Sequence, residues 1–162
     1  MIVLACEGNS EVYLLRSLIE KGMIVFDSQI FMDGPIYARQ IQRYKALLLT
    51  VPTTEEIIVY RIGDTLTDEL DLRGFEARSI TVKKICTKPE IELLIIIQEG
   101  LLNAFEKSKS FIRPKEFIKM HRPKIDIKDY FNEHDMSESI RKYKQIKKHS
   151  KGLGYLADLL KQ

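Results

Sequence analysis

Four short apolar blocks of the chain have the length and composition of β-strands. They cover residues 1–5, residues 23–26 with a continuation through Ile30 and Phe31, residues 57–62 and residues 80–86. The first of these, residues 1–5, is a continuous apolar run, which is typical of a strand that is buried on both faces of a parallel sheet. The hydrophobic pattern therefore predicts four strands within residues 1–86.

Two helical patterns lie between these blocks. The first begins at Asn9 or Ser10, whose side chains can cap a helix, and ends at Gly22. Its apolar residues follow the spacing of one helical face: Val12, Leu15, Leu18 and Ile19. The second pattern spans residues 36–49 and stops before Pro52. Because strands and helices alternate, we predict an α/β fold with a mainly parallel sheet of about four strands.

The rest of the chain is predicted to be helical. Residues 91–105 are apolar nearly all round, as in a core helix, although the β-branched run at 95–97 would also suit a strand. Further helical segments are expected at 114–120, 127–134, 137–149 and 153–160. We therefore divide the chain into an α/β core, residues 1–106, and a helical extension, residues 107–162, packed on that core.

Composition narrows the class of protein without naming a function. The chain is 44% hydrophobic and 30% charged, as in an ordinary soluble protein. No apolar stretch is long enough to span a membrane and no signal peptide is recognisable, so we expect a cytoplasmic protein with no membrane partner. Cys6 and Cys86 both lie in apolar blocks, which favours lone buried thiols over a disulfide or metal pair.

Charge is distributed unevenly along the chain. Residues 1–106 carry 11 Lys and Arg against 16 Asp and Glu, a balance of −5, whereas residues 107–151 carry 14 against 6, a balance of +8. An acidic N-terminal part followed by a basic C-terminal part suits metal chemistry beside a phosphate-binding surface. A basic face that is merely solvated is the alternative.

Carboxylates follow two of the predicted strands. Glu7 comes after the first and Asp64 after the third, and the carboxyl ends of parallel strands meet at one edge of a sheet. Asp68 follows in the same loop, and Glu92 interrupts an apolar run. Oxygen ligands of this kind suit Mg²⁺ or Mn²⁺, which can activate water and neutralise charge on a phosphodiester. Turn roles for Glu7 and Asp64 remain open.

Two acids compete for a role after the fourth strand. Thr87 and Glu90 have the spacing of a capping box, which would give Glu90 a structural task. Glu92 has no such task, and a buried, unpaired carboxylate would be costly. A metal or a basic partner would remove that cost, so we prefer Glu92 as the functional acid.

Two stretches carry a resemblance to a known family. The opening CEGNSEVYLLRSLIEKG resembles TOPRIM-type domains, in which a strand ends in a catalytic Glu-Gly. It is similar to the RloB-like and overcoming-lysogenization-defect proteins, which open on Glu-Gly-x-x-Glu, here Glu7, Gly8 and Glu11. TKPEIELLIII resembles their Asn-Pro-x-Phe-Glu-x-Trp-Leu segment and matches Pro89 and Glu92 to the family Pro and Glu.

The resemblance implies a TOPRIM-like, Rossmann-like domain with Mg²⁺- or Mn²⁺-dependent nuclease activity. It implies catalytic roles for Glu7, Asp64 and Glu92, and a function in defence against phage or mobile DNA beside a separate ATPase. TOPRIM domains usually carry Asp-x-Asp after the third strand, but in RIGDTLTD Leu66 takes the second position and Asp68 lies further on. This departure keeps open a one-metal site, an inactive site and a non-catalytic module that binds a protein or nucleotide.

Basic residues form the second candidate constellation. Lys and Arg neutralise phosphates when a protein binds nucleic acid. The candidates are Lys88, Lys115, Lys119, Arg141, Lys144 and Lys148. The last three share one face of the helix expected from Ser137, where a solubilising role is the alternative. The sequence leaves open DNA or RNA as substrate, the partner, and the oligomeric state, including a homo-oligomer.

Overall fold

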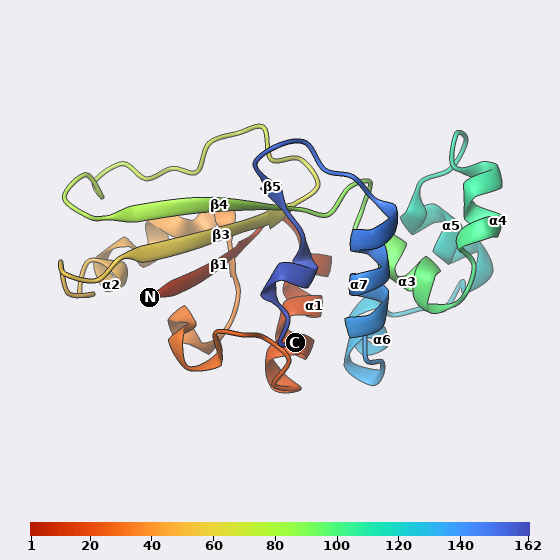
Figure 1. Ribbon diagram of the computed structural model, residues 1–162, viewed down its shortest axis with the longest axis horizontal. Coiled ribbons are helices and arrows are strands. Elements are labelled where there is room, and N and C mark those ends of the chain that lie inside the picture. The colour runs from red at the N-terminus through yellow and green to blue at the C-terminus, as the bar shows by residue number, and fades with distance from the viewer.

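The computed structural model describes residues 1–162, the side chain of Asp27 excepted, and its centre is an all-parallel sheet (Figure 1). The five strands are ordered β2-β1-β3-β4-β5. Their bounds are β1 Ile2–Cys6, β2 Ile36–Tyr37, β3 Ile57–Gly63, β4 Ile80–Cys86 and β5 Leu153–Gly154. The Rossmann-like α/β class expected from the sequence is confirmed, with one strand more than expected.

Helices cover both faces of this sheet, and further helices lie beyond one end of it. They are α1 Asn9–Glu20, α2 Lys45–Leu48, α3 Leu93–Gln98, α4 Leu102–Ser108, α5 Pro114–His121, α6 Ile127–Glu133 and α7 Ser137–Ile146. Short 3-10 helices occupy Asp27–Gln29, Phe31–Asp33, Ala38–Tyr44 and Leu156–Leu159. No described helix combines the length and the apolar composition that crossing a membrane requires.

The predicted second strand is wrong. Ile24 forms a single bridge with Leu160 and Ile30 a single bridge with Ile2, while the edge strand is β2, which pairs with Ala5 and Cys6 of β1. Ile24 and Ile30 are nevertheless buried. These residues are therefore apolar because they are buried beneath the sheet, not because they belong to a paired strand. The helix expected at residues 36–49 is accordingly split into β2, a 3-10 segment and α2.

The later segments also differ from the expected helices. The helix predicted at 91–105 is divided into α3 and α4, because Gly100 between them has a φ of 72°, which a helix cannot accommodate. The segment at 153–160 is strand β5 followed by a 3-10 turn, and β5 pairs with Lys84 and Ile85. Helix α7 ends at Ile146, so Lys148 lies beyond it.

Two apolar clusters lie on the two sides of the sheet. One joins the sheet to α1, α3 and the helices of residues 107–162, and the other joins it to the 3-10 segment and α2. Ser17 of α1 donates a hydrogen bond of 2.6 Å to the carbonyl of Phe131, which ties α6 to the core. Cys6 and Cys86 are buried and unpaired, as expected, and burial raises the pKa of the Cys6 thiol.

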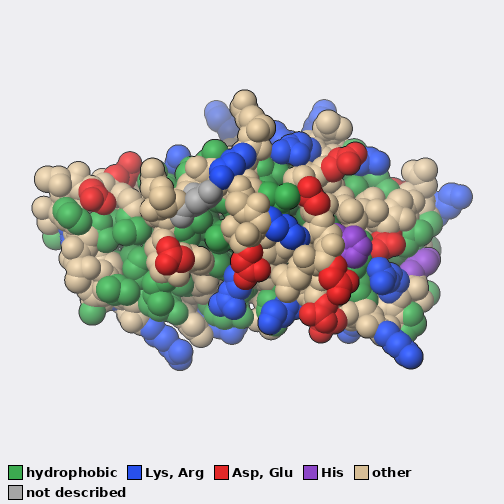
Figure 2. All heavy atoms as spheres, turned by 90° about the horizontal axis from the view of Figure 1, so that it is seen from below, with side chains coloured by type: hydrophobic (Ala, Val, Ile, Leu, Met, Phe, Trp, Pro, Cys, Tyr) green, Lys and Arg blue, Asp and Glu red, His purple; other side chains and the backbone are tan. Residues whose placement is uncertain are grey.

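Hydrophobic side chains also reach the surface. On the face seen from below they gather over the end of the molecule that carries α2 (Figure 2). Leu47 of α2 and Leu49, which follows this helix, are both exposed. The opposite end of the same view shows acidic and basic side chains interspersed (Figure 2). The charged chemistry therefore lies away from α2, toward the helical extension.

Candidate functional site

Glu7 follows β1 directly and lies across the end of β3. Its backbone N–H donates to the Ile62 carbonyl at 2.9 Å, which continues the β1–β3 pairing by one residue. Its carboxylate accepts from the Thr65 backbone N–H at 3.1 Å and from Arg61 Nη2 at 3.2 Å. Burial, opposed by the hydrogen bond from Thr65, raises the pKa of Glu7 above its usual value. Glu7 is therefore a positioned acid, not a free turn residue.

Two glycines make room for the carboxylates at this edge. A Cβ on Gly63, the last residue of β3, would lie 2.1 Å from Oε2 of Glu7. A Cβ on Gly8 would lie 2.9 Å from Oε2 of Glu11. Since real Cβ contacts are longer than this, any side chain at position 63 would displace Glu7. The glycines explain how acids can occupy the seam between strand and helix.

Glu11 is the most perturbed acid of the site. It lies in the first turn of α1 with only 7% of its surface exposed, and its Oε1 accepts a long hydrogen bond of 3.4 Å from Thr87 Oγ1. Burial, together with the charges of Glu92, Asp64 and Glu7, raises its pKa to about 7. The sequence analysis named Glu11 only through the family resemblance. A signal was present, because Glu11 shares the helical face of Leu15 and Leu18.

Glu92 and Glu90 approach the same edge from the segment before α3. Glu92 is 5% exposed and accepts a hydrogen bond of 2.8 Å from Ser10 Oγ, so its partner is a hydroxyl, not a cation. The capping box expected at Thr87 and Glu90 is wrong, because α3 begins only at Leu93. Glu90 instead accepts from the Lys115 backbone N–H at 3.2 Å, and burial, together with the Glu92 charge, raises its pKa.

These acids line one cavity of about 460 Å³ at the carboxyl edge of the sheet, which we call the carboxylate cavity. Its lining comprises Glu7, Gly8, Asn9, Ser10, Glu11, Asp64, Glu90, Ile91, Glu92, Arg113 and Lys115. The structure thus brings the predicted Glu7, Asp64 and Glu92 together and adds two further glutamates to them. Arg113 and Lys115 bring positive charge to the same cavity, and Arg113 Nη1 lies 4.0 Å from Glu90.

Asp68 lies on the other side of Glu7. It lines a separate cavity of about 420 Å³ with Arg39 and Arg61, and its side chain is 81% exposed. Arg61 Nη2 lies 3.7 Å from Asp68 and 3.2 Å from Glu7. The buried Nε and Nη1 of Arg61 have no hydrogen-bond partner among the described residues. Arg61 therefore lies between Glu7 and Asp68, a position that no pattern in the sequence indicates.

The predicted basic residues are dispersed. Lys115 lines the carboxylate cavity, whereas Lys88 and Lys148 line a different cavity. The other three lie elsewhere: Lys119 is exposed on α5, Arg141 donates to the Lys161 carbonyl at 3.0 Å, and Lys144 pairs with Asp158 at 2.6 Å. The predicted basic residues therefore do not form a single helix face.

The carboxylates share a cavity without converging on one point. Across the described residues, no three His, Cys, Asp or Glu side chains are arranged closely enough to hold a metal ion. Comparisons with protein-family models, with curated proteins and with solved structures found no match to this chain. What this chain does must therefore follow from the geometry and charge of the site.

Proposed function

We propose that this chain is a metal-dependent nuclease of the TOPRIM-like type, which cleaves phosphodiester bonds in nucleic acid. The observation that carries the proposal is the crowding of acids around Glu11, whose pKa is raised to about 7 by burial and by the charges of Glu92, Asp64 and Glu7. Such like charges repel one another strongly in a poorly solvated site. A bound cation would convert that repulsion into ligation.

The chemical type of the donors, though not their present arrangement, suits Mg²⁺ or Mn²⁺. Hard divalent cations prefer carboxylate oxygens, and the residues that would hold one are Glu7, Asp64 and Glu92, with Glu11 beside them. Asp68 does not line this cavity and lies beside Arg61 instead. When bound, such an ion activates water and neutralises charge on the phosphodiester.

The chain's own residues supply the remaining chemistry. Glu7 has a raised pKa and is held by Thr65 and Arg61, so it suits a general base. Arg113 and Lys115 line the same cavity and would attract the phosphate toward the acids. Substrate binding and proton transfer would then occur within one cavity.

Calorimetric titration with Mn²⁺ tests the proposal directly. We expect the wild type to bind the ion and the double variant Glu7→Gln with Asp64→Asn to lose that binding. A matched variant, Glu20→Gln with Asp33→Asn, removes two exposed acids outside the cavity and should bind as the wild type does. Mg²⁺-dependent cleavage of labelled RNA or DNA should follow the same pattern. Equal ion binding by both variants would disprove a metal site here.

A second candidate is a non-catalytic module that binds a protein partner or a nucleotide. The arrangement of the acids favours it, because the described carboxylates do not converge at ligand distances. This candidate predicts no carboxylate-dependent ion binding and no cleavage in the same titration. A role in defence against phage or mobile DNA, with a separate ATPase, is part of our proposal on the family resemblance alone.

A further inference from the structure

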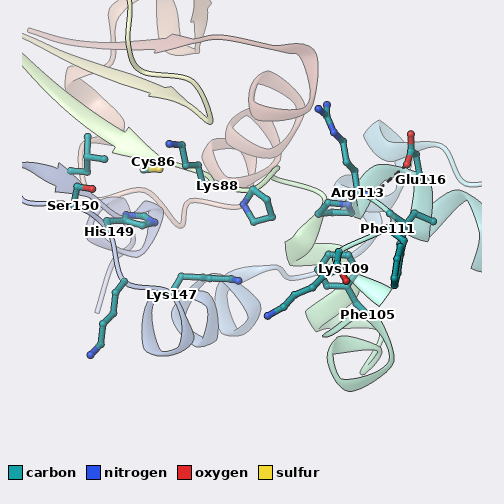
Figure 3. A pocket seen from close by; sticks show the side chains of 16 residues that line it. Cys86, Lys88, Phe105, Lys109, Phe111, Arg113, Glu116, Lys147, His149 and Ser150 are labelled. Atoms are coloured by element: carbon teal, nitrogen blue, oxygen red, sulfur yellow. Dashed lines mark hydrogen bonds between the residues drawn. The ribbon is translucent and has the colours of Figure 1, made fainter. Parts of the chain in front are cut away.

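A second, larger cavity lies beside the carboxylate cavity and is lined by basic and apolar residues. Its volume is about 700 Å³, and it lies where the end of β4 meets the helical extension (Figure 3). Lys109 and Lys147 extend toward one another across it, and His149 and Phe111 lie at its opposite ends (Figure 3). We call it the basic cavity. Its volume is within the range of small-ligand sites, which is roughly 300–1,000 Å³.

Positive charge dominates this lining. The cationic residues are Lys88, Lys109, Arg113, Lys147 and Lys148, and the acidic one is Glu116. Lys109 is paired with Glu106, but Lys88, Lys147 and Lys148 form no ion pair within the described residues. Uncompensated cations around one cavity repel one another and attract a polyanion. The basic cavity is therefore suited to phosphate groups.

Apolar side chains supply the other part of the lining. Phe105 is buried behind the cavity, while the ring of Phe111 is 90% exposed. A phenylalanine this exposed beside cations is the kind of platform on which a nucleobase stacks. His149 is not a free ligand, because its ring stacks on Tyr155 at 4.0 Å and its nitrogens contact the Gly154 carbonyl and the Tyr143 hydroxyl, each at 3.0 Å. It forms a wall of the cavity.

The two cavities adjoin at one shared residue. Arg113 lines both, and Lys88 and Pro89 of the basic cavity are followed directly by Glu90 of the carboxylate cavity. A chain of nucleotides bound in the basic cavity would therefore present its next phosphodiester to the acids. Repeated phosphates with accessible bases are properties of a single strand, because a duplex keeps its bases stacked and paired.

We propose that the basic cavity binds a segment of single-stranded nucleic acid, with phosphates on Lys88, Lys147 and Lys148 and one base on Phe111. This inference names the substrate class of the proposed nuclease. Only the cleavage of the bound strand rests on that proposed function. Binding itself requires no metal ion. Strand binding can therefore be tested under conditions in which the carboxylate cavity holds no metal ion.

Fluorescence anisotropy with a labelled single-stranded oligonucleotide in EDTA is the test. We expect Lys147→Ala with Lys148→Ala to raise the Kd at least tenfold and to lower the salt slope by roughly 1.4, about 0.7 for each lost phosphate contact. The matched variant Lys124→Ala with Lys128→Ala removes two exposed lysines outside the cavity and should change the Kd less than twofold. Equal losses in the two variants would overturn the proposal.

Phe111 provides an independent test, because its exposed ring can be changed without affecting the core. Phe111→Ala should raise the Kd about tenfold, and Phe111→Tyr should retain binding, since stacking needs only the ring. A duplex of the same sequence and a nucleoside 5′-monophosphate should both bind more weakly than the single strand. Equal binding of either competitor would show that the cavity does not select a single strand.

The test of strand binding and the test of the proposed nuclease function can give different results. Strand binding is measured in EDTA and ion binding is measured without nucleic acid, so each can fail without the other. Loss of ion binding with retained strand binding would refute the nuclease and leave this inference standing. Ion binding without strand binding would refute this inference alone.

Discussion

Neutralising Glu11 should remove most of the pH dependence of stability between pH 5 and pH 8. Glu11 is buried, and its pKa is raised from its usual value of 4.5 to about 7. The folded state therefore retains a proton over a pH range in which the unfolded state has lost it. The resulting destabilisation is absent below about pH 4.5, grows as the pH rises, and is complete above about pH 7.

The magnitude follows from the size of the shift. One pKa unit corresponds to about 1.4 kcal/mol, so the shift of Glu11 lowers the free energy of unfolding by about 3 kcal/mol at pH 8 relative to pH 4.5. In Glu11→Gln the amide oxygen can still accept the hydrogen bond from Thr87. The variant should therefore match the wild type near pH 5 and exceed its stability at pH 8.

Urea denaturation followed by circular dichroism at several pH values provides the measurement. Glu7 and Glu90 have raised pKa values and act in the same direction, whereas the lowered pKa of His149 acts in the opposite direction. The difference between wild type and variant largely cancels these contributions. Glu20→Gln, an exposed acid on the same helix, is the control and should follow the wild type. A variant that keeps the wild-type slope would refute the reasoning.

Three further outcomes are expected. Gly63→Ala places a Cβ 2.1 Å from the Glu7 carboxylate and should abolish ion binding in a Mn²⁺ titration while costing about 1–3 kcal/mol in urea denaturation. Ser17→Ala should cost about 1 kcal/mol in the same denaturation assay, because Lys21 Nζ still donates to the Phe131 carbonyl at 2.8 Å. At pH 8, Mg²⁺ at about 100 times its Kd should raise the wild-type free energy of unfolding by about 2.7 kcal/mol, and an unchanged midpoint would count against the site.

The strands that could be predicted are those in the middle of the sheet. β1, β3 and β4 are each paired on both sides; β1 and most of β3 are buried, and β4 keeps enough apolar and β-branched residues to be recognised although only Ile85 and Cys86 of it are buried. β2 and β5 each have two residues, which is too short for a periodic signal. The block at 23–31 has the same composition as a strand, but it meets the rest of the fold through single bridges.

Two arguments from the sequence identified acids of the site. The carboxyl ends of parallel strands placed Glu7 and Asp64 at one edge of the sheet, and the cost of burying an unpaired carboxylate indicated Glu92. Neither argument could find the partner of Glu92, because the Ser10 hydroxyl approaches it only in the folded chain. Asp68 likewise lies beside Arg61, a cation buried in β3 whose strand pattern gives no sign of its contacts. Local patterns identify the acids, and tertiary contacts decide which of them meet.

The position of β5 also limits how the helical part of the molecule can move. The chain leaves the sheet after Cys86 and returns at Leu153, and β5 lies against Lys84 and Ile85 of the strand that it left. Residues 87–152 thus form a closed excursion anchored at both ends on β4. Because residues of this excursion line both cavities, a ligand that spans them would contact one continuous part of the chain that is anchored on β4.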